Sequence, residues 1–151
     1  MTPKFRGKST AEENKGEWVY GNLVFDKDLA IIVSGIDEAT CEYIAFEDFC
    51  SVDIDTVGQS TGLFDKNGVE VFEGDLLSWN GEMPHIVKFG QWICEDDLGY
   101  KIRNIGFYID SSYDNTEWFQ GIDYENTPIK FEIIGNIYEN PELMEADDDT
   151  K

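Results

Sequence analysis

Turn signals recur along this chain at intervals of about ten residues, and short apolar runs lie between them. The two pairs Asn67-Gly68 and Asn80-Gly81 are the clearest signals, because glycine adopts a positive φ at little steric cost. No amphipathic helix longer than about three turns fits any part of the sequence. The pattern therefore predicts a mostly β fold of antiparallel strands, arranged as a small barrel or sandwich with little helix.

Individual strands can be placed from the same signals. Residues 17–25 read as a strand interrupted at Gly21, and a turn at residues 26–28 should pair it with a strand over 29–35. Residues 41–49 suit a strand or a short helix. Residues 54–65 read as a strand end that leads into a loop, while 85–90 and 91–95 read as two successive strands.

The length and the apolar content set the domain organisation. Hydrophobic residues make up 41% of the 151 residues, which is enough for a core. We expect a single β domain over residues 1–143, or two packed halves over 1–58 and 59–143. EGDLLSW at 73–79 and HIVKF at 85–89 resemble the opening strands of SH3-like barrels, and this resemblance implies SH3-like barrel elements in the C-terminal half. Pro141 prevents the last strand from continuing, and residues 141–146 can form one helical turn. Residues 144–151 are expected to be an acidic, disordered tail.

Charge is the strongest compositional feature. The chain has 32 acidic and 11 basic residues, and no Lys or Arg occurs between Asp28 and Asp65. Such a surface repels phosphate, so we expect no direct binding to nucleic acid. It would attract a protein with a basic surface, although the charge can also serve solubility alone. The candidate acidic face consists of Asp37, Glu38, Glu42, Glu47, Asp48, Asp53 and Asp55.

Signs of catalysis are nearly absent from the sequence. The single histidine, His85, has no nucleophile or carboxylate at a telling spacing. The segment beginning at Asp65 resembles the start of a calcium loop, but its glycine comes two positions early and the closing Glu is missing. Three cysteines without a C-x-x-C pair predict neither a disulfide framework nor a zinc site. We expect no catalytic residue, no metal and no cofactor.

Two alternatives stay open at this point. A hydrolase could use carboxylates together with His85. A pocket could hold a small phage or host metabolite. If the ligand is a nucleotide, such a pocket needs cationic or backbone donors, and Lys88, Lys101 and Arg103 are among the few candidate cations. Separately, Trp118 and Phe119 follow a polar segment and precede Gly121, so they are candidate loop aromatics for contact with a partner.

Four segments occur in an order that points to a family. They are KFRGK at 4–8, GEWVYGNL at 16–23, TVGQSTGLFDKNGVEVFEGDLL at 56–77 and FEIIGNIYENPEL at 131–143. Together they closely resemble the YopX family of phage and prophage proteins. The resemblance implies a small, mostly β, phage-encoded protein of the infected bacterium. It supplies no catalytic residues, and no motif covers residues 78–130.

The expected function is that of a non-enzymatic accessory binding protein whose partner is a host or phage protein with a basic surface. The alternative is an acidic mimic of nucleic acid that inhibits a host nuclease or an antiphage defence protein. No apolar run reaches the ~20 residues of a membrane span, so we expect a location in the cytoplasm of the bacterial host. Exposed strand edges are compatible with a homodimer or a higher homo-oligomer.

Overall fold

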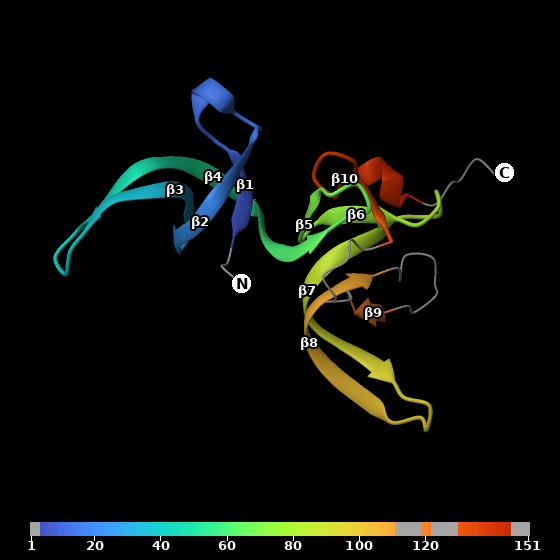
Figure 1. Ribbon diagram of the computed structural model, residues 1–151. Coiled ribbons are helices and arrows are strands. Elements are labelled where there is room, and N and C mark those ends of the chain that lie inside the picture. Colours follow the sequence, from blue (N-terminus) through green and yellow to red (C-terminus); the bar gives the residue numbers. More distant parts are fainter. Residues whose placement is uncertain (1–3, 111–118, 122–129, 146–151) are drawn as a thin grey trace. The chain divides into compact units, whose positions relative to one another are not determined.

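The computed structural model describes residues 4–110, 119–121 and 130–145. They form two compact units, residues 1–60 and 61–151 (Figure 1). The elements are β1 (Phe5–Ser9), η1 (Glu12–Asn14), β2 (Trp18–Asp26), β3 (Leu29–Ala39), β4 (Ile44–Phe64), β5 (Glu70–Phe72), β6 (Asp75–Ser78), β7 (His85–Glu95), β8 (Lys101–Asp110), β9 (Phe119–Gly121), β10 (Glu132–Asn136) and η3 (Pro141–Met144). The expected antiparallel, mostly β fold is confirmed, while SH3-like barrel elements stay a prediction.

The first unit is a ring of four strands. β1 pairs with β2 and also with β4, so the order β1-β2-β3-β4 closes on itself. Its buried core consists of Ala30, Ile32 and Val52, against which Phe5, Val19, Leu23 and Val57 pack. The expected hairpin between β2 and β3 is confirmed, with Asp26 paired to Leu29 and Lys27 at φ 55° in the turn.

β4 corrects two readings of the sequence. It runs unbroken from Ile44 to Phe64, so the interpretation of residues 54–65 as a strand end that leads into a loop was wrong. The segment 41–49, which suited a strand or a short helix, enters this strand at Ile44. β4 pairs with β3 up to Val52, then with β1 up to Gln59, and its last part lies beside β5. Its continuity depends on three successive neighbours, which no local pattern reveals.

The second unit contains the sheet β10-β6-β7-β8-β9. Its core consists of Val71, Leu77, Val87, Phe107 and Ile109, with Leu63, Phe131 and Ile133 packed against it. The two strands expected over 85–90 and 91–95 are one strand, β7, because Gly90 stays in the ladder opposite Gly106. In the loop between β6 and β7, Asn80 and Gly81 both have positive φ (52° and 76°), as the centre of a mirror-image turn requires, and the Glu82 amide closes this turn by donating to the Trp79 carbonyl at 3.0 Å.

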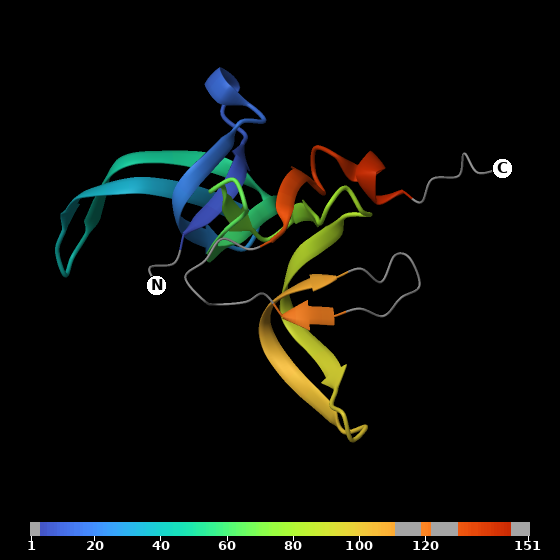
Figure 2. The same ribbon diagram turned by 45° about the vertical axis from the view of Figure 1, so that its right-hand side comes forward.

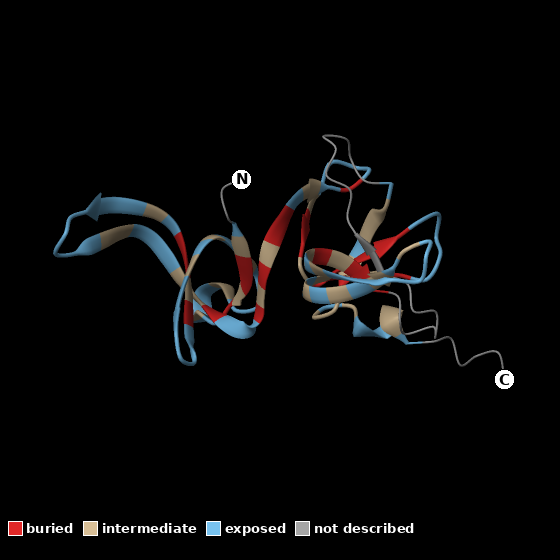
Figure 3. Ribbon diagram, turned by 90° about the horizontal axis from the view of Figure 1, so that it is seen from below, coloured by how far each residue is buried: buried red, intermediate tan, exposed pale blue. Residues whose placement is uncertain are grey.

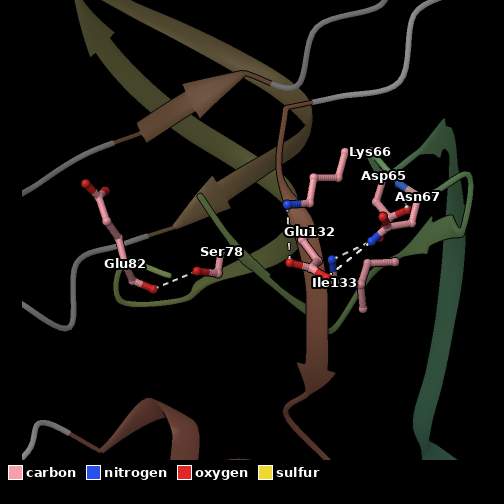
Figure 4. A network of polar contacts seen from close by, with 7 residues as sticks. All are labelled: Asp65, Lys66, Asn67, Ser78, Glu82, Glu132 and Ile133. Carbon is pink, nitrogen blue, oxygen red and sulfur yellow. Dashed lines mark hydrogen bonds and ion pairs between the residues drawn. The ribbon is translucent and has the colours of Figure 1, made fainter. Parts of the chain in front are cut away.

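Asp65 connects a turn of the second unit to its last strand (Figure 4). The carboxylate is 1% exposed, and its Oδ1 accepts hydrogen bonds from the amides of Asn67 and Val69 at 2.9 and 2.8 Å. Its Oδ2 accepts a hydrogen bond from the amide of Ile133 in β10 at 3.1 Å. The side chain that resembled the first ligand of a calcium loop is therefore occupied by three backbone donors.

The chain after β10 agrees in part with the expected helical turn. η3 begins at Pro141 and ends at Met144, with the proline in its first turn. The remainder of the expected acidic tail, residues 146–151, lies outside the described residues. Among the described residues, no helix is long and apolar enough to cross a membrane.

Candidate functional site: an acidic ribbon with an apolar face

The β3–β4 hairpin extends beyond the other strands of its unit as a two-stranded ribbon (Figure 1). We call residues 35–49 the distal ribbon. Its turn is closed by Thr40, whose Oγ1 accepts hydrogen bonds from the amides of Glu42 and Tyr43 at 3.2 and 3.1 Å. The Thr40 amide also donates to the Tyr43 carbonyl at 2.9 Å. The distal ribbon thus has a defined turn although no third strand supports it among the described residues.

Five of the seven acidic candidates lie on the distal ribbon, and all five are exposed: Asp37, Glu38, Glu42, Glu47 and Asp48. The segment contains no Lys or Arg. The Glu47 side chain covers Gly35, at whose Cα a Cβ would stand 3.3 Å from Glu47 Cβ. The structure therefore brings these five carboxylates onto one element, with a concentrated negative charge.

Asp53 and Asp55 belong to a different place. In the β1–β4 ladder Arg6 pairs with Gly58 and Lys8 with Asp53, so residues 54–57 bulge out of the ladder. Within the bulge Asp53 Oδ1 accepts a hydrogen bond from the Asp55 amide at 3.0 Å, which gives this carboxylate a local structural role. The seven candidates therefore do not form one surface by themselves.

The distal ribbon also presents apolar side chains that the charge count did not reveal. Ile36 lies opposite Phe46 and Ala39 opposite Ile44, so these four share one face, because directly paired residues of antiparallel strands do. The Phe46 ring contacts the Phe49 ring edge-on, with centroids 6.0 Å apart, which continues the stripe toward the ring of strands. Ile36, Ile44 and Phe49 are 55–58% exposed. Figure 3 shows that most of this ribbon, at the left, has the colour of exposed residues.

Irregular pairing keeps the carboxylates from forming a regular array. The β3–β4 register shifts three times, between Val33 and Gly35, between Gly35 and Ile36, and between Ile36 and Glu38. Each shift interrupts the alternation of faces that a uniform ladder would have. As a result Glu38 lies opposite Ala45, on the face away from Ile44 and Phe46. The distal ribbon is better described as amphipathic than as a row of evenly spaced charges.

Tyr43 connects the two kinds of side chain. Its hydroxyl donates a hydrogen bond of 2.7 Å to Glu38 Oε2. This bond to a carboxylate, with a smaller effect of desolvation, raises the pKa of Tyr43 above its ordinary value. The phenol therefore stays protonated well above neutral pH and holds the Glu38 carboxylate beside the turn.

A ladder of cations and aromatic rings on β1 and β2 was not anticipated from the sequence. Arg6 Cζ lies 4.3 Å and Lys8 Nζ 5.2 Å from the Trp18 ring centroid, and Lys4 Nζ lies 5.5 Å from that of Tyr20. The signal was present, because KFRGK and EWVYG both repeat their key residues every second position, as paired strands do. These contacts give the two N-terminal motifs a structural role in which cations stack on rings.

The remaining candidates are placed as follows. His85 packs edge-on against Phe131 at a centroid distance of 5.9 Å. Within the described part of the chain, no group of three His, Cys, Asp or Glu residues converges as a metal site would. Trp118 lies outside the described residues, and Phe119 begins the short strand β9, of which only the backbone is described.

Comparison with known proteins bears on the whole chain. A family model described as YopX protein matches residues 4–145. The crystal structure of protein EF1440 from Enterococcus faecalis is 24% identical and covers 96% of this chain and 99% of that chain, with a TM-score of 0.55. At that identity the likeness shows a shared fold alone. No curated protein matches this chain significantly.

Proposed function

Because this chain belongs to the YopX family, we propose that it is a phage-encoded, non-enzymatic accessory binding protein of the infected bacterial cell. Its partner in this proposal is a host or phage protein with a basic surface, met in the cytoplasm. The proposal concerns binding because two side chains that were considered for chemistry make structural contacts. Asp65 is held by three backbone amides and His85 packs against a ring.

The observation that carries this proposal is the amphipathic distal ribbon. Its five carboxylates favour a cationic partner, while Ile36, Ile44 and Phe49 favour an apolar one. Complete burial of such a side chain is worth about 1.5–3 kcal/mol, so covering three that are half exposed contributes on the order of 3 kcal/mol. Exposed ion pairs add only ~0–1 kcal/mol each, and they mainly guide encounter and orientation.

These magnitudes describe the surface that would fit. It is a protein surface with an apolar strip bordered by Lys or Arg, so that both faces of the distal ribbon find a counterpart. Phosphate groups of nucleic acid would be repelled by the carboxylates and would leave the apolar face in water. The side chains that we expect to dominate the affinity are Phe49 and Ile44, because large apolar anchors dominate most interfaces.

A second candidate function is mimicry of nucleic acid, with inhibition of a host nuclease or an antiphage defence protein. The net charge of −21 and the absence of Lys and Arg over 29–64 favour it. It requires carboxylates at a spacing like that of phosphates, whereas the three register shifts disturb the spacing along the distal ribbon. In mimicry the apolar face of the distal ribbon has no role, so apolar substitutions there should weaken binding only if the first function is correct.

The test is retrieval of partners from phage-infected cells with matched variants. Phe49→Ser removes an apolar anchor, and Phe25→Ser serves as its control, because Phe25 is 64% exposed but lies near the β2–β3 turn. A third variant neutralises charge through Asp37→Asn, Glu38→Gln and Glu47→Gln. We expect Phe25→Ser to retain the partner, and the other two variants to lose most of it at low and at moderate salt.

The outcomes separate the two functions. If only the charge-neutralised variant loses the partner, and if salt or added DNA releases it from the wild type, mimicry is the better account. If all variants retrieve the same proteins as the wild type, the distal ribbon is not the binding surface.

A further inference from the structure

The β7–β8 hairpin of the second unit is a second two-stranded ribbon (Figures 1 and 2). β6 pairs with β7 only at His85 and Ile86, and β9 pairs with β8 only over residues 108–110. Among the described strands, the hairpin from the pair Phe89–Phe107 to its tip therefore has no neighbour on either edge. On one face of the hairpin, Trp92 and Tyr108 contact each other across the paired glycines 90 and 106, with ring centroids 6.2 Å apart. This face therefore has an aromatic contact of its own.

The opposite face of this hairpin, away from Trp92 and Tyr108, extends the apolar core of its unit toward the tip. The face begins with the buried pair Val87–Ile109 and the pair Phe89–Phe107, whose ring centroids are 4.9 Å apart. Farther along come the pairs Gln91–Ile105 and Ile93–Arg103, and Glu95–Lys101 ends the hairpin face. Phe89, Ile93 and Ile105 on this face are 51%, 45% and 78% exposed. The apolar stripe therefore extends beyond the part of the unit that covers its base.

The charges of this hairpin differ from those of the rest of the chain. Residues 85–110 contain three of the 11 basic residues and four of the 32 acidic ones. On the apolar face Glu95 belongs to β7, whereas Lys101 and Arg103 belong to β8. A chain with a net charge of −21 repels its own copies over most of its surface. Contact between two copies is favoured where the charge is balanced and an apolar stripe is exposed.

We propose that two copies of this chain associate through this face of the β7–β8 hairpin, related by a twofold axis along the length of the hairpin. Such an axis exchanges the strands, so each β7 lies against the β8 of the other copy. Glu95 of each copy then meets Lys101 of the other, and Ile93 meets the aliphatic stem of Arg103. Ile105 of each copy then lies over Gln91 of the other at the centre of the contact, and Phe89 borders it, because Phe107 is only 9% exposed and is already covered by its own unit.

The face is self-complementary because its acid and its bases lie on opposite strands at matching rows. A twofold axis perpendicular to the strands and centred on the exposed rows would instead place Glu95 near the apolar row Val87–Ile109 of the other hairpin, without an opposite charge. The second copy is therefore the occupant that suits both the charge and the apolar pattern. This surface is separate from the distal ribbon, so the proposal does not depend on the proposed function.

A charge-exchange experiment on the full chain tests the proposal by sedimentation velocity at several concentrations. The wild type should dimerise. Glu95→Lys alone and Lys101→Glu alone should each weaken self-association at least tenfold, or by about 1.4 kcal/mol, because each places like charges across the contact. An equimolar mixture of the two variants should recover a dimer with an affinity near that of the wild type. Pairing between positions 95 and 101 within one chain cannot produce this recovery, since in each variant these two positions carry the same charge.

A matched pair of apolar variants controls for folding. Ile105→Glu introduces a charge at the centre of the face, whereas Ile102→Glu introduces the same group on the opposite face of β8, opposite Cys94. Ile105→Glu should abolish the dimer and Ile102→Glu should leave it intact, with unchanged circular dichroism in both. A wild type that is monomeric at every concentration, or a mixture that fails to recover the dimer, overturns the proposal.

Discussion

Replacing Asp65 by alanine should destabilise the second unit by about 3 kcal/mol. The turn at Asp96 provides an internal reference, because Asp96 Oδ1 accepts hydrogen bonds from the amides of Leu98 and Tyr100 at 2.9 and 2.8 Å, as Asp65 Oδ1 does from Asn67 and Val69. These amides lie in exposed turns where water can replace the carboxylate, so the two bonds together contribute about 1 kcal/mol.

The third bond distinguishes the two aspartates. The Ile133 amide donates a hydrogen bond of 3.1 Å to Asp65 Oδ2, and Asp65 is almost entirely buried. A hydrogen bond to a charged group is worth about 1.5–3 kcal/mol, so its loss accounts for the remaining ~2 kcal/mol. Asp65→Asn should fall between wild type and alanine, because its amide oxygen can keep the turn while its NH₂ group faces the Ile133 donor.

Thermal unfolding followed by near-ultraviolet circular dichroism measures the difference. For a chain of this length about 1 kcal/mol corresponds to ~2–4 °C, so the midpoints of Asp65→Ala and Asp96→Ala should differ by about 4–8 °C. Equal midpoints for the two alanine variants would refute the reasoning, because the bond between the turn and β10 would then contribute nothing to stability.

Three further predictions concern single positions. Gly68→Val should cost about 1–2 kcal/mol, because Gly68 has φ 81° with no atom near its missing Cβ, so strain comes from the backbone alone; unchanged stability in urea unfolding would contradict the turn. Gly21→Ala should cost about 1–3 kcal/mol, because its Cβ would overlap the Val33 carbonyl oxygen, a backbone atom; a wild-type unfolding midpoint would disagree with the close approach of β2 and β3. Glu38→Gln should lower the pKa of Tyr43 in a titration of ring ¹³C shifts, since the bond to the carboxylate raises it. Because the folded pKa is the higher one, this bond contributes stability that is complete below the ordinary tyrosine pKa of about 10 and is lost as the pH rises through the folded value; a contribution that instead grew with rising pH would contradict this assignment.

Local signals predicted the turns and the strand class well. Asp26 and Leu29 close the β2–β3 hairpin, and Asn80 and Gly81 adopt the positive φ that their pair indicates. Turn chemistry depends on a few consecutive residues, so the sequence contains what is needed. The predictions for the length of β4 and for a break within β7 were wrong, because both features depend on residues that are distant in the sequence. In β4 the Thr61 hydroxyl donates a hydrogen bond to the Val71 carbonyl, and in β7 Gly90 pairs with Gly106 of β8.

The candidate site shows the same division. The sequence alone determined that residues 28–65 carry acid without base, and that four motifs resembling those of the YopX family occur in order between residues 4 and 143. It could not show that Asp53 and Asp55 lie in a bulge beside β1 while the other five acids lie on the distal ribbon. It also could not show that Ile36, Ile44 and Phe49 stay exposed, because a strand with alternating residues is compatible with either a covered or an open face.

Charge and turn chemistry are properties of residues and their immediate neighbours, and they were determined by the sequence. Register, pairing and exposure are properties of two or more segments that meet in space, and the tertiary structure decided them. The three register shifts between β3 and β4 are the clearest case. They convert an acidic stretch of sequence into an amphipathic ribbon, because a shift of one residue moves a side chain from one face of a strand pair to the other.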